Sequence, residues 1–94
     1  MFKELDPLLH SQLRLAVMSL LLGTEEADFV YIREKAGATA GNLSVQLDKL
    51  SEAGYIDVEK SFVGKKPRTT CRITERGREA MAADVEALRG YLDL

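Results

Sequence analysis

The chain has 94 residues, which is enough for one small domain with a thin hydrophobic core. Hydrophobic residues make up 46% of it and charged residues 30%, which indicates a globular, soluble protein. No apolar run reaches the roughly 18 to 20 residues that span a membrane, and the stretch LRLAVMSLLLG lacks the basic flank of a signal peptide. One cysteine excludes an internal disulfide, and one histidine leaves little for a metal site. We therefore expect a cytoplasmic protein with no cofactor, no metal and no membrane partner.

Positive charge is concentrated in one segment of an otherwise acidic chain. The formal net charge is −2, but residues 60–78 hold seven Lys and Arg residues and a single Glu, a net charge of +6. The preceding 59 residues carry −5 and the last 16 carry −3. For a nucleic-acid-binding protein the distribution of charge matters more than its sum, so this segment is a candidate for contact with phosphates.

The first half of the chain predicts three helices. Asp6 as N-cap and Pro7 as first residue predict a helix over about 7–22. Asp28 can cap a short second helix that Gly37 ends. A third helix, over about 39–53, follows within a few residues and carries Leu43, Leu47 and Leu50 on one face. Two helices joined by so short a turn are typical of a helix-turn-helix.

After Gly54 the hydrophobic period changes from helical to alternating. Residues 55–60 and 69–74 predict two strands of a hairpin, joined by the basic loop around Gly64 and Pro67. Thr74 can then cap a last helix over about 75–91. The predicted architecture is therefore mainly α with a small β-hairpin (α+β), in the order helix-helix-helix-strand-strand-helix, as a single domain over residues 1–94.

The motifs GNLSxxLxxLxxAGYI, GKKPRTT and xITxxGR, together with LDPLLHSQLRLAVMSLL near the start, resemble the small stand-alone winged helix-turn-helix transcriptional regulators. These are relatives of the multiple-antibiotic-resistance and arsenical-resistance repressors. The resemblance covers nearly the whole chain. It implies a homodimer that binds double-stranded DNA, with the third helix in the major groove and the wing, about 61–69, on the flanking backbone.

The candidate DNA-contacting residues come from the third helix and the wing. Asn42 and Gln46 lie one turn apart, and each amide can pair with an adenine edge, while Ala40 and Gly41 would let the backbone approach the groove. The alternatives are an ordinary polar helix face and a solvated lysine cluster that protects a strand edge. The full candidate set is Thr39, Ala40, Gly41, Asn42, Ser44, Val45, Gln46, Lys49, Lys65, Lys66 and Arg68.

The last helix carries two apolar stripes, and a helix docked on one small core needs only one. The first helix also has leucines on more than one side. We therefore expect these helices of two subunits to pack into a dimer, although a thin core could instead cover more of the helix. The candidate interface residues are Leu8, Leu15, Met81, Val85, Leu88, Tyr91 and Leu92.

Other functions have less support in the sequence. Cys71 could be a redox sensor but is more typical of a small buried hydrophobe, and His10 lacks the neighbours of a metal ligand. No phosphate-binding glycine motif, metal cluster or activated nucleophile indicates an enzyme. The rival class is a winged-helix protein–protein interaction module that does not bind DNA, and the acidic Asp48 and Glu52 on the third helix favour it. The operator, the sign of regulation and any small-molecule effector are not determined by the sequence.

Overall fold

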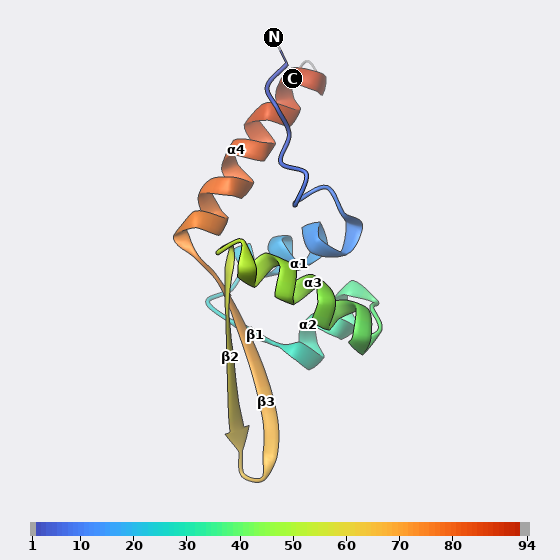
Figure 1. Ribbon diagram of the computed structural model, residues 1–94, viewed down its shortest axis with the longest axis vertical. Coiled ribbons are helices and arrows are strands. Elements are labelled where there is room, and N and C mark those ends of the chain that lie inside the picture. The colour runs from blue at the N-terminus through green and yellow to red at the C-terminus, as the bar shows by residue number, and fades with distance from the viewer. Residues whose placement is uncertain (1, 93–94) are drawn as a thin grey trace.

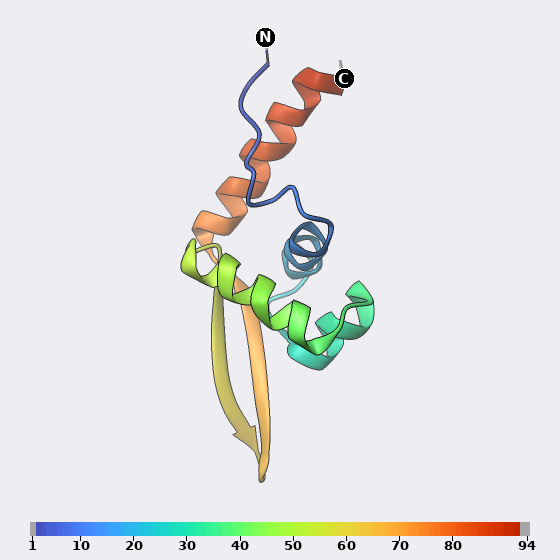
Figure 2. The ribbon, with the colours of Figure 1, turned by 45° about the vertical axis from the view of Figure 1, so that its right-hand side comes forward.

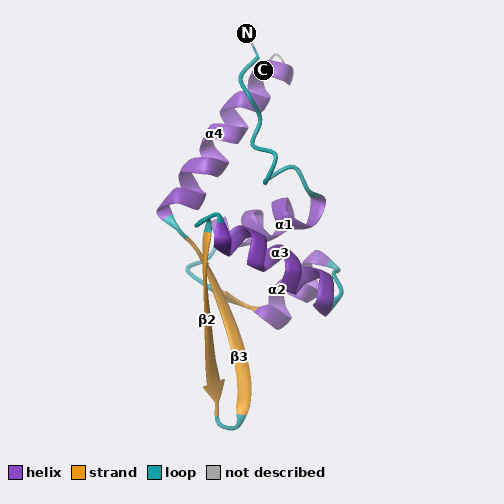
Figure 3. Ribbon diagram, in the orientation of Figure 1, coloured by secondary structure: helices purple, strands orange, loops and turns teal. Residues whose placement is uncertain are grey.

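The computed structural model of the protein describes residues 2–92 and contains four helices and three strands in that range (Figure 1; Figure 3). In chain order the elements are α1 (Gln12–Leu22), β1 (Ala27–Asp28), α2 (Phe29–Ala36), α3 (Ala40–Glu52), β2 (Ile56–Val63), β3 (Lys66–Ile73) and α4 (Glu75–Leu92).

The first helix begins five residues later than predicted, at Gln12 instead of Pro7. Asp6 does bind a nearby backbone group, because its carboxylate accepts the N–H of Leu8 at 3.0 Å. However, that contact closes a single turn, and the chain then extends at Ser11, whose hydroxyl accepts the N–H of Arg14 as the helix N-cap. The prediction of a helix from residue 7 was therefore wrong, because the N-cap that starts the helix is Ser11 and not Asp6.

The helix-turn-helix boundaries were predicted correctly. Asp28 caps α2 by accepting the N–H of Tyr31 at 2.8 Å, and Gly37 ends it in the left-handed conformation at φ 64°. Thr39 caps α3 by accepting the N–H of Asn42 at 3.2 Å. Glycine adopts positive φ without steric cost, so these local signals place α3 directly after α2.

The expected two-stranded hairpin is part of a three-stranded antiparallel sheet with strand order β1-β3-β2. The short β1 was missed, and it pairs Ala27 with Cys71 and Asp28 with Thr70. Strand β3 is therefore central, and both Thr70 and Cys71 are buried although strict alternation would expose one of them.

The hairpin is also longer than predicted. Its strands pair as far as Val63 and Lys66, so that the turn contains only Gly64, at φ 64°, and Lys65. Most of the segment that was expected to form a loop, residues 62–68, is paired strand, because each strand satisfies the backbone groups of the other. The wing is therefore the outer part of this hairpin, residues 61–69.

One hydrophobic core joins the helices to the base of the sheet. Leu43, Leu47 and Leu50 of α3 are buried in it, as the helical spacing predicted. The other buried members are Leu9, Val17, Met18, Leu21, Ala27, Ile32, Ile56, Cys71 and Met81. This packing holds α3 against the rest of the domain by its apolar face and leaves its polar face outside.

The molecule is elongated, with extents of 54 × 24 × 21 Å. The β2–β3 hairpin projects from one end, and α4 with the N-terminal segment beside it forms the other end (Figure 1; Figure 2). The ring of Phe2 stacks on that of Tyr91 with centroids 4.8 Å apart, and the Tyr91 hydroxyl donates to the carbonyl of Lys3 at 3.0 Å. Across residues 2–92 we find no helix long and apolar enough to cross a membrane.

Candidate nucleic-acid interface

The face of α3 opposite its buried leucines is open to solvent along the whole helix. Gln46 is half-buried, and the other candidate residues of this helix are exposed, namely Thr39, Ala40, Gly41, Asn42, Ser44, Val45 and Lys49. A methyl group added at Gly41 would have no atom within 4 Å. The backbone at the start of α3 is thus free to approach another surface closely.

The two amides expected to contact bases are bonded to each other and to a third residue. The Nε2 group of Gln46 donates to Oδ1 of Asn42 at 3.0 Å, and Nη1 of Arg14 donates to Oε1 of Gln46 at 2.5 Å. Sequence analysis missed Arg14, which lies on α1, 32 residues before Gln46. No local pattern in the sequence links the two positions.

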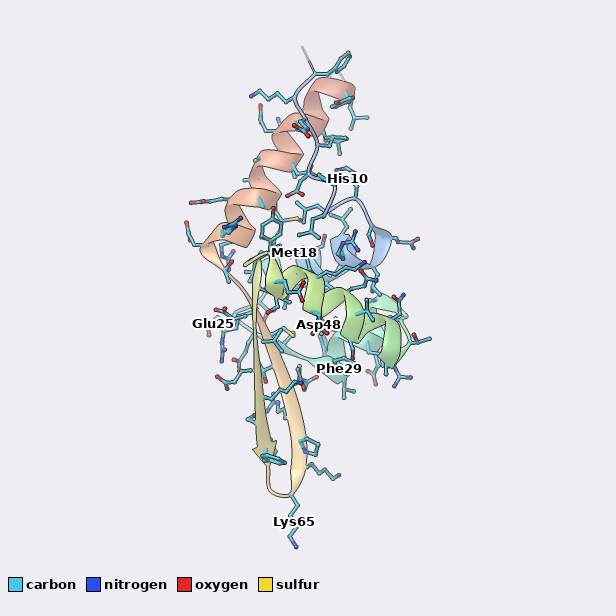
Figure 4. The ribbon with its side chains drawn as sticks, viewed as in Figure 1. His10, Met18, Glu25, Phe29, Asp48 and Lys65 are labelled. Carbon is cyan, nitrogen blue, oxygen red and sulfur yellow. The ribbon has the colours of Figure 1, made fainter. Side chains whose placement is uncertain are left out.

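The wing carries its cations in different electrostatic surroundings. Lys65 lies in the turn and points away from the body of the molecule (Figure 4), and Lys66 starts β3. Neither forms an ion pair with the residues that the structure describes, whereas Arg68 lies 3.8 Å from the carboxylate of Asp28. Exposed pairs of this kind contribute little to stability, so Arg68 can exchange its partner for a phosphate.

Another member of the basic segment is more firmly neutralised. Arg72 on β3 contacts Glu26, the residue before β1, at 2.8 Å and Glu59 on β2 at 3.8 Å. The net charge of +6 counted along the sequence therefore overstates the positive charge that this surface presents. The cations most available to a ligand are those nearest the wing tip.

The wing tip also exposes apolar side chains that sequence analysis did not select. Phe62 is 73% exposed and pairs across the strands with Pro67, and the neighbouring Val63 is also exposed. Alternation along a strand predicts that one of two consecutive residues is buried, but no other element of residues 2–92 covers the hairpin this far from the core (Figure 1). The tip thus combines cations with an uncovered aromatic ring.

Acidic residues occupy the second half of the outer face of α3. Asp48, labelled in Figure 4, and Glu52 are both exposed. Phosphates would be repelled from this half, so a polyanion would contact the first half of α3 and the wing in preference to the whole helix.

The expected dimer residues fall into two groups. Leu15 on α1 and four apolar residues of α4, Val85, Leu88, Tyr91 and Leu92, are exposed, and Leu92 retains 57% of its surface. In contrast, Met81 is only 6% exposed and belongs to the core, on which Leu8 also packs. The uncovered apolar surface of α4 therefore begins beyond Met81.

A network of polar groups joins the N-terminal segment to α4. The nearly buried carboxylate of Asp84 accepts the N–H of Asp6 at 2.8 Å and contacts Nε2 of His10 at 2.9 Å. The hydroxyl of Tyr55 donates to Asp6 at 2.5 Å, and this bond raises the pKa of Tyr55. His10 thus has a carboxylate partner 74 residues away that sequence analysis did not find.

Cys71 is fully buried in the central strand, as expected of a small hydrophobe. Burial raises the pKa of its thiol to about 11, so the reactive thiolate is scarce at neutral pH. Within residues 2–92 there is no group of three or more His, Cys, Asp and Glu side chains that could hold a metal ion.

Comparisons with known proteins agree with this geometry. Residues 13–92 match the family model of the winged helix DNA-binding domain. The uncharacterized protein MJ0432 of Methanocaldococcus jannaschii is 38% identical over 71 residues, which cover 76% of this chain and 77% of that protein.

Solved structures extend the likeness to three dimensions. The transcriptional regulator homologue protein of Pyrococcus horikoshii OT3 has a TM-score of 0.83 and 29% identity, over 92% of this chain and 85% of that one. A MarR-family regulator from Silicibacter pomeroyi has a TM-score of 0.71 and 20% identity, over 92% and 57% of the two chains. These matches confirm the expected winged-helix fold.

Proposed function

Because the chain belongs to the winged helix DNA-binding domain family, we propose that it regulates transcription as a homodimer, with the first half of α3 in the major groove and the wing on the flanking backbone. The observation that carries this proposal is the pairing of two exposed features. One is the first half of α3, with an uncovered backbone at Gly41. The other is the wing tip, where Lys65 and Lys66 have no acidic partner among the described residues.

The two features suit different parts of a DNA duplex. The first residues of a recognition helix usually meet base edges, and long flexible cations suit phosphates. In this assignment Lys65, Lys66 and Arg68 neutralise phosphates, and the groove is lined by Thr39, Ala40, Gly41, Asn42, Ser44, Val45 and Gln46. Lys49, the remaining candidate of α3, lies in the second half of the helix beside Asp48. The exposed Val45 would add apolar contact with a thymine methyl group.

The apolar surface of α4 supports the dimer. Val85, Leu88, Tyr91 and Leu92 are exposed on the second half of α4. This half of α4 lies at the end of the molecule opposite the wing (Figure 2). Large uncovered apolar patches usually mark interaction surfaces in soluble proteins. Two-fold packing through this end would leave both α3 helices free to read half-sites about one DNA turn, roughly 34 Å, apart.

Fluorescence anisotropy against a mixed-sequence duplex, at several salt concentrations, tests the wing. Replacing Lys65, Lys66 and Arg68 by alanine should flatten the slope of log affinity against log salt by roughly 2 to 3 units, because fewer counterions are released. The matched control replaces Lys3, in the N-terminal segment, and Arg89, in the last turn of α4. Both are exposed and lie outside α3 and the wing, so the slope should stay unchanged. An unchanged slope in the wing variant would show that the wing does not contact the DNA.

A second candidate is a winged-helix module that binds a protein. The exposed Phe62 and Val63 at the wing tip favour it, as do Asp48 and Glu52 on α3. The same titration separates the two: a module of this kind would bind no duplex even at low salt, where electrostatic attraction is strongest.

A further inference from the structure

The hydrogen-bonded chain from Arg14 through Gln46 to Asn42 has a direction, and that direction bears on which base pair is read. We propose that Arg14 is a positioning residue that turns the amino group of Asn42, and not its carbonyl oxygen, toward the major groove. The site then prefers guanine to adenine at the base that Asn42 contacts. This inference rests on the proposed function, and it replaces the adenine contact expected from the sequence.

The direction follows from the chemistry of the guanidinium group. Arginine has N–H donors and no acceptor, so the atom of Gln46 that faces Nη1 of Arg14 must be the oxygen Oε1. The amino group of Gln46 is thereby turned toward Asn42, where it donates to Oδ1 at 3.0 Å. One donor-only residue thus fixes the orientation of two amides that could otherwise each adopt either orientation.

Arg14 is itself held in place. Its Nε group donates to the carbonyl of Leu8 at 2.6 Å, and its side chain is half-buried between the N-terminal segment and α3. Because the guanidinium is anchored at Nε as well as at Nη1, it does not need to be ordered when DNA arrives. Ordering a long side chain only on binding would cost affinity.

Asn42, at the outer end of the chain, presents donors. Its Oδ1 faces Gln46, so the Nδ2 amino group points the other way, and within residues 2–92 it donates to no protein acceptor. The side chain is exposed in the first turn of α3. A group approaching from the solvent side therefore meets N–H bonds.

Base edges differ in how they match such a group. In the major groove guanine offers two adjacent acceptors, O6 and N7, whereas adenine offers one acceptor beside the N6 amino donor. The familiar two-bond contact between an asparagine and adenine needs both a donor and an acceptor from the same amide. Here the acceptor is turned inward to Gln46, so guanine fits and adenine does not.

Selection of bound fragments from a random duplex library tests the inference. The Asn42→Ala variant first identifies the base pair that this residue reads, because selectivity disappears there alone. At that position the unmodified protein should prefer guanine to adenine about 5- to 150-fold, the range for a good specific contact. Selection of adenine over guanine at that position would overturn the inference.

Three variants then test the direction of the chain. Gln46→Glu keeps the shape but offers acceptors at both ends, so Asn42 must turn its amino group inward and its oxygen outward. Selection should then move from guanine to adenine or cytosine, which carry amino donors. Arg14→Met should allow both orientations and admit guanine and adenine alike, whereas Arg14→Lys, which also has donors only, should keep guanine. Identical selections from Gln46→Glu and the unmodified protein would refute the proposal.

A measurement without DNA tests separately whether Arg14 orients the two amides. In nuclear magnetic resonance spectra of the free protein, Arg14→Met should shift the side-chain amide signals of Gln46 and also of Asn42, which Arg14 does not bond directly. If the Asn42 signals do not move, Arg14 does not act on Asn42 through Gln46, and the proposal is refuted whatever the DNA selections give. If the unmodified protein bound no duplex at all, the proposed function and the base preference would both fall, while these spectra would still show whether Arg14 orients the amides.

Discussion

Gly77, in the first turn of α4, is the position where the structure forbids the smallest possible side chain. It is buried, and a Cβ atom built on it would lie 2.1 Å from the carbonyl oxygen of Tyr55 and 2.9 Å from Cγ1 of Ile73. We predict that Gly77→Ala destabilises the protein, although alanine favours a helix over glycine by about 1 kcal/mol.

The neighbouring groups cannot move away without losing hydrogen bonds. The Tyr55 oxygen accepts the N–H of Thr74 at 3.0 Å, and the Thr74 hydroxyl accepts the N–H of Gly77 at 3.0 Å and donates to Gly54 at 2.6 Å. Relief of the 2.1 Å contact to an ordinary separation needs a shift of about 1 Å. Overpacking costs about 1–3 kcal/mol and a lost hydrogen bond about 1 kcal/mol, so we expect a net loss of about 2 kcal/mol after the helix gain.

Thermal unfolding followed by circular dichroism measures this loss. For a domain of this size each kcal/mol corresponds to roughly 4–8 °C, so Tm should fall by about 8–16 °C. All samples need the same protein concentration, because dimerisation would make Tm depend on it. The control is Gly41→Ala on α3, where a Cβ meets nothing within 4 Å and Tm should stay or rise slightly. A Gly77→Ala protein that melts at or above the unmodified one would refute the reasoning.

Three further predictions concern assembly, titration and the polar network. Leu88→Glu combined with Leu92→Glu should give a monomer with much weaker DNA binding; a light-scattering mass of 10.4 kDa for the unmodified protein would already contradict the dimer. Burial raises the pKa of the Cys71 thiol from 9.0 to about 11. As the pH rises, the thiol therefore ionises at lower pH in the unfolded chain than in the folded protein, and the free energy of unfolding should fall by about 2 kcal/mol between about pH 9 and 11. Urea titrations that show no such fall, or the same fall in Cys71→Ser, would argue against ionisation of Cys71 as its cause. Asp84→Ala leaves the N–H of Asp6 and the ring of His10 without their acceptor and should cost about 1–3 kcal/mol in the same assay, whereas Asp84→Asn, which keeps an oxygen, should cost less.

Local signals in the sequence were sufficient for the helix-turn-helix. The caps at Asp28 and Thr39 and the left-handed Gly37 act within three or four residues of the helix ends that they define. The spacing of Leu43, Leu47 and Leu50 likewise selects the buried face of α3 without reference to any partner. The helix-turn-helix and the buried face of α3 could therefore be predicted from local signals in the sequence alone.

The sheet shows where local signals end. Two residues, Ala27 and Asp28, carry no strand pattern, and they form β1 only because β3 supplies the partners for their backbone groups. For the same reason the wing strands extend to Val63 and Lys66, past the point where alternation in the sequence is clear. Pairing between strands is decided by the partner as well as by the strand itself.

The sequence by itself determined that α3 carries Asn42 and Gln46 on a polar face and that the wing carries Lys65 and Lys66. Only the tertiary structure placed Arg14 against Gln46, 32 residues away, and so gave the amides an orientation. It also placed Asp84 against His10 over 74 residues, and showed that Gly77 lies against the backbone of Tyr55. The physical reason is that caps, turns and helical spacing depend on neighbours along the chain, whereas hydrogen bonds and close packing between distant residues exist only after the core has brought them together.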